Sequence, residues 1–338
     1  MLDVGPVVVY DASTDRGTEA ATPFDAGGAI EGGLPRYLSQ TGLYADIATG
    51  TIATSALAYT PQGVLWADGA TKNRWVYLPP GKQIDTADMD HWIYPAGTKI
   101  WKEFSIEGVR IETRLIEKMS DTEGDWSLVA YQWKTDQSDA IAVPNGVPDA
   151  APNAGDAGTT HDIPATADCK RCHGGLPDDV LGFTAVQLSH TGSGVTLQKL
   201  LDEHELTKPP AAPLVVPGDP VARTALLYLH ANCGQCHNES TLVGQNTGVR
   251  FFLRANALGS VQATDSYHTA EAELATPALP AETRMILRMG LRGAGQMPPL
   301  ATKDVDETGV HDVLAWLRAL AAANAADAGA RDGGADAH

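Results

Sequence analysis

The stretch Cys-Lys-Arg-Cys-His at residues 169–173 decides how this chain is interpreted, and it recurs as Cys-Gly-Gln-Cys-His at residues 233–237. Both copies read Cys-x-x-Cys-His, the signature for covalent attachment of a c-type haem. Two thiols one helical turn apart can each form a thioether with a haem vinyl group, and the adjacent His can bind the iron. The chain has four cysteines, all of them in these motifs. We therefore expect two covalently bound haems c, attached through Cys169, Cys172, Cys233 and Cys236.

Two other uses of paired cysteines fit the sequence less well. Zinc ribbons separate their cysteine pairs by about 15–20 residues, whereas 60 residues lie between Cys172 and Cys233. A thioredoxin-like redox pair would follow a strand in a βαβ unit and would not be duplicated in this way. The His after each pair favours haem over both alternatives.

The second haem has a clear candidate for its sixth ligand. His173 and His237 are the expected proximal ligands, and Met297 lies 60 residues after His237 in Gly-Gln-Met-Pro-Pro. The two prolines push Met297 into an extended backbone and stiffen the loop that presents its sulfur. The alternative is a methionine that only fills the core. His/Met ligation raises the reduction potential, which suits an electron carrier.

The first haem leaves several candidates for the distal position. His190 follows its motif closely within the same small segment and is the first choice. The competing residues are His161, His204, His91 and Met119. If no side chain fills the position, the iron is open to small ligands.

The net charge and the expected haems limit the possible binding partners and the cellular compartment of the protein. The net charge is 24 − 42 = −18, which disfavours nucleic acid and would steer a basic redox partner to the surface. Covalent haem attachment in bacteria takes place outside the cytoplasmic membrane, so we expect a periplasmic or cell-surface protein. Residues 1–34 show no basic and apolar leader and are expected to form a flexible acidic tether, as would suit a membrane-tethered lipoprotein.

The pattern of apolar and polar residues along the chain predicts an α+β architecture with several domains. Residues 35–150 are expected to be β-rich, with alternation along 109–115 that is typical of a half-buried strand. Six of the seven tryptophans lie between 66 and 133, which favours a small sandwich core over a sugar-binding face. Residues 151–210 are too few to enclose a haem alone, so the first haem should pack on the β domain.

The C-terminal half is expected to be an all-α class I cytochrome c module over residues 211–322. Asp219 can cap a helix that has Pro220 at its first position and leads into the second motif. Val310, Val313 and Leu317 form one apolar stripe of a final helix that would cross it. Residues 323–338 are acidic and Ala-rich and are expected to be disordered.

An ordered set of further motifs resembles a family of bacterial diheme c-type cytochromes from proteobacteria and myxobacteria that have a β-rich N-terminal region. The similarity spans roughly residues 38–320, and its motifs are Leu65-Trp-Ala-Asp-Gly, Tyr94-Pro-Ala-Gly-Thr-Lys, Tyr131-Gln-Trp-Lys-Thr-Asp, His161-Asp-Ile-Pro, Gln187-Leu-Ser-His and the Met-Pro-Pro loop. The resemblance implies an extracytoplasmic location and an electron-transfer role. The stretch between Asn238 and Met297 is shorter than the family pattern.

Three functions follow as hypotheses. The leading one is a non-catalytic carrier that passes electrons between redox proteins. The alternative is a diheme peroxidase or oxidase with an open first haem, in which His161 or His190 would act as acid/base group. A third is a binding module whose Trp-rich β domain recognises a partner or glycan.

Overall fold

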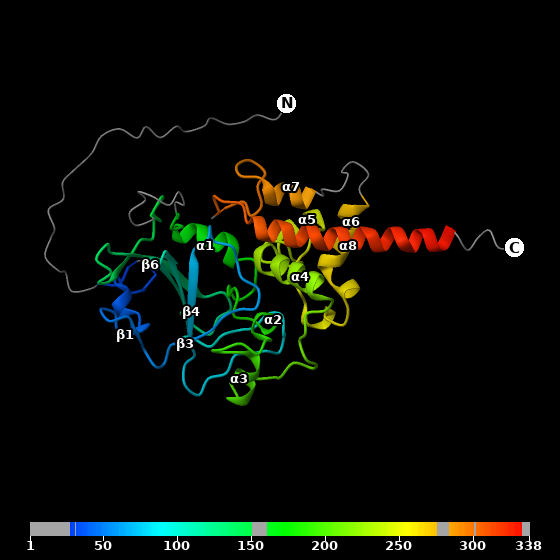
Figure 1. The fold of residues 1–338 in the computed structure, drawn as a ribbon. Helices are drawn as coiled ribbons and strands as arrows, with labels where there is room; N and C mark the ends of the chain where they lie inside the picture. The colour runs from blue at the N-terminus through cyan, green and yellow to red at the C-terminus, as the bar shows by residue number, and fades with distance from the viewer. Residues whose placement is uncertain (1–27, 31, 151–160, 276–283, 301, 333–338) are drawn as a thin grey trace, which may run out of the picture.

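The computed structural model describes residues 28–30, 32–150, 161–275, 284–300 and 302–332. Most of the expected tether (1–27) and the low-complexity stretch 151–160 lie outside the described residues. The chain combines a β-rich region with a helical region, so the expected mixture of α and β structure is confirmed. Figure 1 shows the strands at one end of the molecule and helices α4 to α8 at the other.

Six antiparallel strands form the main sheet, and their order in the sheet follows the chain. They are β3 (Leu57–Ala58), β4 (Thr71–Tyr77), β5 (Lys99–Ile106), β6 (Val109–Lys118), β7 (Trp126–Trp133) and β8 (Ala140–Ala142). A separate ribbon pairs β1 (Tyr44–Asp46) with β2 (Thr51–Ile52), after a short 3-10 turn, η1 (Leu38–Gln40). The predicted strand along 109–115 is confirmed as part of β6. The expected sandwich is instead one sheet with different coverings on its two faces.

The outer face of this sheet carries Trp101, Leu115 and Val129, which pack with the N-terminal residues Leu34 and Leu38. Alternate residues of a strand point to opposite faces, so the cross-strand row Val76, Ile100, Ile116 and Leu128 defines the inner face. This row packs with Phe183, Leu188 and Leu200 from the segment after the first motif.

The prediction that this strand is half-buried was wrong, because both faces of β6 are covered. Glu112, on the inner face, has a fully buried side chain, and that of Arg114 is 25% exposed. The pattern of alternating charge therefore marks a covered polar region rather than a face in contact with bulk water.

Three short helices cover the inner face: α1 (Thr166–His173), α2 (Ala185–Leu188) and α3 (Leu197–Asp202). Helix α1 lies on β7, where the hydroxyl of Thr166 donates to the carbonyl oxygen of Leu128 over 3.3 Å. Cys169, one turn further on, packs against the apolar core of this face. The first motif is thus fixed on the sheet.

The helical region contains α4 (Pro220–Asn232), α5 (Leu242–Thr247), α6 (Asp265–Leu274), α7 (Arg284–Gly290) and α8 (Glu307–Asp332), with 3-10 turns η2 (Ala255–Ala257) and η3 (Val261–Ala263). The Asp219 side chain accepts a hydrogen bond from Ala222 N over 2.9 Å, which confirms the predicted cap. Helix α4 packs against α8, and Gly309 lies on the ring of Tyr228. A side chain at Gly309 would occupy the place of that ring.

Helix α8 buries Val313 and Leu317 in the helical core, as predicted from the apolar stripe. It continues to Asp332, well into the segment that we expected to be disordered from 323 onward. The run of alanines is a strong helix former, which explains the extension. Across the described ranges, no helix combines the length and apolar character needed to span a bilayer.

Candidate haem-binding site

The two Cys-x-x-Cys-His motifs lie in contact with each other. The thiols of Cys172 and Cys236 share a hydrogen bond. Beside them, the side-chain amide of Asn238 donates to the carbonyl oxygens of Gly175 over 3.4 Å and Gln235 over 3.0 Å. A Cβ at Gly175 would collide with the Gln235 carbonyl oxygen, so only glycine permits this close approach.

The four thiols differ in how readily they ionise. Burial raises the pKa of Cys169 and raises that of Cys233 to about 12. The shared hydrogen bond raises the pKa of Cys172 and lowers that of Cys236 to about 7. Since the thiolate is the nucleophile and the ligand form of cysteine, Cys169 and Cys233 are held as neutral thiols at neutral pH.

His173 is held in the form that an iron ligand requires. Its Nδ1 atom lies 2.6 Å from the carbonyl oxygen of Asp179, which fixes the proton on Nδ1 and leaves Nε2 with a lone pair. Burial lowers the pKa of His173 to about 4, aided by the charges of Lys102, Arg114 and Lys170. The ring is therefore neutral at pH 7 and fits a haem iron.

The loop that presents the Asp179 carbonyl is tied to the sheet through its neighbour Asp178. The buried carboxylate of Asp178 pairs with the buried ammonium of Lys118. It also accepts from the backbone NH groups of Tyr94 over 2.7 Å and Gly124 over 2.8 Å, and from Trp126 Nε1 over 3.0 Å. Sequence reasoning missed both aspartates, whose only signal is their place just after the first motif.

His237 is placed by the strand-like segment that follows α5. The Phe251 NH donates to the His237 carbonyl oxygen over 2.8 Å, and the two rings lie 5.7 Å apart. Burial lowers the pKa of His237, and the nearby backbone of Val249 opposes this shift. Nδ1 of His237 is buried without a hydrogen bond of good geometry among the described residues. A neutral imidazole again fits an iron ligand.

Met297 lies at the edge of the same region. Its NH donates to the Arg288 carbonyl oxygen over 2.9 Å, and the charge of Arg288 lies near enough to His237 to lower the pKa of that ring further. Met285 and Met289 of α7 pack into the helical core. Ligation by Met297 stays a prediction.

Both ring nitrogens of His190 form hydrogen bonds with backbone groups. Its Nε2 atom lies 2.7 Å from the carbonyl oxygen of Thr60, and its Nδ1 accepts from the Gly192 NH over 2.9 Å. Among its competitors, His161 is buried on the inner face, 2.7 Å from the Glu112 carboxylate, with its ring 5.3 Å from Phe104. Ligation by His190 stays a prediction, and it would require the ring to leave two backbone hydrogen bonds.

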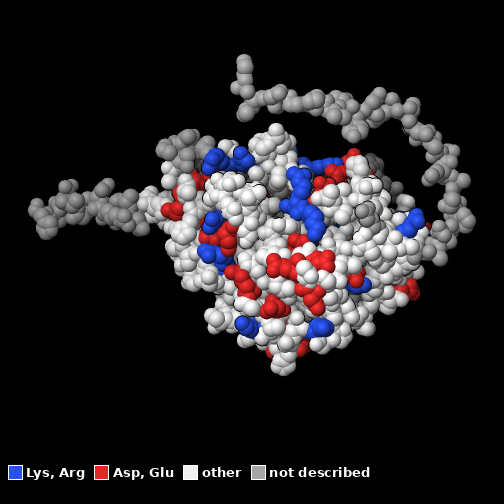
Figure 2. Space-filling view, turned by 180° about the vertical axis from the view of Figure 1, so that it is seen from behind, with Lys and Arg blue, Asp and Glu red and all other residues white. Residues whose placement is uncertain are grey.

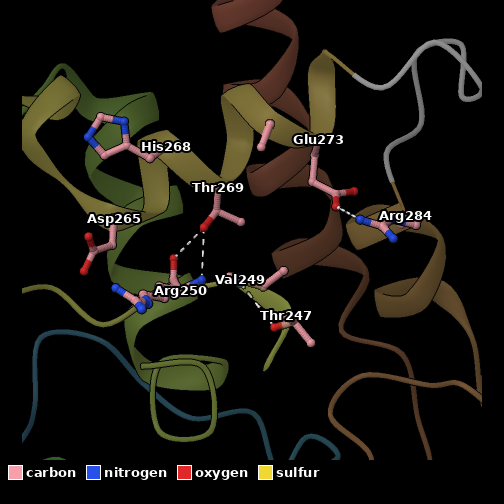
Figure 3. A pocket seen from close by; sticks show the side chains of 10 residues that line it. Thr247, Val249, Arg250, Asp265, His268, Thr269, Glu273 and Arg284 are labelled. Carbon is pink, nitrogen blue, oxygen red and sulfur yellow. Dashed lines mark hydrogen bonds and ion pairs between the residues drawn. The ribbon is translucent and has the colours of Figure 1, made fainter. Parts of the chain in front are cut away.

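A cavity of about 250 Å³ lies in the helical region between the loop after α5, helix α6 and the start of α7 (Figure 3). Several of the residues that line the cavity bond one another. Arg250 and Thr269 exchange two hydrogen bonds of 3.0 and 2.9 Å, and Glu273 pairs with Arg284 over 2.6 Å. The cysteines and histidines of the two motifs are not among the described residues that line it. The cavity is therefore separate from the motifs.

A zinc cage is not present in the part of the chain that the structure describes, since no three His, Cys, Asp or Glu side chains there converge to hold a metal ion. Haem requires no such cage, because the macrocycle holds the iron and the protein adds only axial ligands. In comparisons with known proteins, no family model, curated protein or solved structure matches this chain.

Proposed function

We propose that this protein is an extracytoplasmic diheme c-type cytochrome that carries electrons between redox partners. The observation that carries the proposal is the contact between the two Cys-x-x-Cys-His motifs, where Asn238 donates to the Gly175 carbonyl oxygen over 3.4 Å and Gly175 lies against the Gln235 carbonyl oxygen. Bound haem would supply a one-electron redox centre at each motif. Two thioether-linked groups attached through neighbouring thiols would have their edges close together, and electron transfer is fast over short distances.

The protein's own contribution is to hold two neutral imidazoles in fixed orientations. His173 is fixed by the Asp179 carbonyl, and His237 by the backbone link to Phe251. In this proposal the two cysteines of each motif anchor the haem, and Met297 completes the second iron site. The cysteines and histidines of both motifs are half-buried, and the remaining exposure to water would influence the reduction potentials.

The packing of α4 on α8 supports a cytochrome c-like arrangement of the helical region. In the proposal the helix that leads into the second motif is supported by the terminal helix through the Gly309–Tyr228 contact. Cys233, at the end of α4, packs into the same apolar core. Fixing the thiol at a helix end would fix the edge of the haem attached to it.

The surface suits transient docking to a basic redox protein. Figure 2 shows acidic side chains gathered across the middle of one face, with basic ones above and below them. Together with the net charge of −18, this distribution would accelerate encounter with a cationic partner and weaken as salt is added.

Electron paramagnetic resonance of the oxidised, haem-loaded protein tests the proposal. We expect two low-spin ferric signals that broaden each other magnetically, because the motifs touch. A high-spin signal in the untreated protein, together with turnover of hydrogen peroxide, would instead favour the diheme peroxidase. Two signals without mutual broadening would contradict the adjacent placement.

A further inference from the structure

Three cationic side chains form one row across the inner face of the sheet. Arg74 of β4 pairs with Lys102 of β5, and Lys102 with Arg114 of β6. We call these three residues the cation row. Like charges directly opposite one another on neighbouring strands destabilise a sheet. A row of three in a chain of net charge −18 therefore needs a compensating group.

The protein itself compensates only one end of the cation row. Arg114 binds the buried carboxylate of Glu112, with one contact of 3.0 Å. Arg74 is only 7% exposed, and among the described residues neither Arg74 nor Lys102 forms an ion pair with a carboxylate. The Lys102 ammonium lies 4.8 Å from the centre of the Phe104 ring, and burial and the neighbouring cations lower its pKa well below the usual value. Arg74 and Lys102 therefore have no carboxylate partner of their own among the described residues.

The cation row is next to the first motif. The adjacent row on the same face, with Ile116 and Leu128, packs against Cys169. The charge of Arg114 acts on the thiols of Cys169 and Cys172, and those of Lys102 and Arg114 act on His173. Strands lie about 4.8 Å apart, so Arg74 is about 10 Å further from the motif than Arg114.

We propose that Arg74 and Lys102 bind the two propionate carboxylates of the haem attached to the first motif. This inference rests on the proposed function and assigns further residues to it. The propionates leave the haem at the edge opposite the vinyl groups, so thioethers at Cys169 and Cys172 would direct them away from the motif and along the row. Each of the two side chains that lack a bonded carboxylate would then gain one, and a propionate beside Lys102 would favour its charged form.

The assignment has an electrostatic consequence. A cation that pairs with a propionate offsets negative charge close to the iron, which favours the reduced state and raises the reduction potential. Removing either cation should therefore lower the potential of the first haem and leave that of the second unchanged.

The experiment is a spectroscopic redox titration of the full haem-loaded protein and its Lys102→Gln, Arg74→Gln and double variants. Lys99→Gln is the matched control, because Lys99 lies on the same strand but on the opposite face and pairs with Glu117. We expect one of the two potentials to fall in each row variant, to fall further in the double variant and to recover in Lys102→Arg. The control should keep both potentials.

Two outcomes would overturn the inference while leaving the proposed function standing. The first is a double variant that carries both haems with both potentials unchanged. The second is a shift of the native potential by added inorganic phosphate that Lys102→Gln abolishes, since the row would then bind a free anion. A native protein that takes up no haem would instead reject the proposed function itself.

Discussion

The Nδ1 atom of His173 lies 2.6 Å from the carbonyl oxygen of Asp179, six residues further along the chain. This bond closes the loop after the first motif and orients the ring of His173. The neighbouring carboxylate of Asp178 anchors the loop to the sheet through Lys118 and three further donors. The geometry of the first motif therefore depends on a buried ion pair between the loop and β6.

Asp178→Asn should destabilise the protein by about 3–5 kcal/mol, because it leaves the buried Lys118 without its counter-charge. Urea unfolding gives the free energy of unfolding of the variant and the native protein. Asp168→Asn is the control, since Asp168 and Arg171 are 3.8 Å apart and about half exposed, and such pairs contribute less than about 1 kcal/mol. Equal small losses in both variants would show that the buried pair contributes little.

His230 should make stability fall in mild acid. Burial lowers its pKa to about 4, and its Nδ1 accepts from the Leu253 NH over 3.1 Å. In the unfolded chain His230 becomes protonated near pH 6.5, whereas in the folded protein it stays neutral until about pH 4. The folded state therefore loses stability as pH falls from about 6.5 towards 4. The expected loss is about 2 kcal/mol between pH 7 and pH 5.

Unfolding measured at pH 7 and pH 5 checks this expectation by comparison between variants. His230→Gln should lose this part of the pH dependence. His311→Gln should retain it, because the side chain of His311 is 80% exposed. The same slope in all three proteins would exclude His230 as the source.

Met297→Ala should remove the sulfur–iron charge-transfer absorption of the second haem and lower its reduction potential, because His/Met ligation raises the potential. Met289→Leu is the matched control, since Met289 is buried in the helical core and that exchange conserves volume. An unchanged absorption in Met297→Ala would assign the sixth position to another residue.

The distal ligand of the first haem can be decided by two variants. His190 is the first choice from sequence, so His190→Ala should turn the first haem high-spin, provided that haem binding draws the ring away from the two backbone groups that it bonds. His161 has a carboxylate on one ring nitrogen, the arrangement that supports metal-ligating histidines. A low-spin signal in His190→Ala together with a high-spin first haem in His161→Ala would contradict the prediction and assign the position to His161.

Local features of the fold could be predicted from the sequence. The cap at Asp219, strand β6 and the apolar stripe around Val313 each follow from short patterns in neighbouring residues. The extension of α8 was missed because its acidic, Ala-rich composition was taken as a sign of disorder, although alanine favours helix.

Contacts between distant segments could not be predicted in the same way. Nothing local indicates that the polar side of β6 is covered, because the covering segment begins far along the chain at His161 and α1. The contact of Cys172 with Cys236 likewise depends on how two separate segments pack. The cation row requires the register of β4, β5 and β6, which single-strand alternation does not specify.

Intact-mass measurement of the protein produced together with a haem-attachment system tests the central claim most directly. The account predicts the mass of the chain plus two haems, and plus one haem when Cys233 and Cys236 are both changed to Ser. The mass of the bare chain, or of the chain with zinc alone in native conditions, would contradict it.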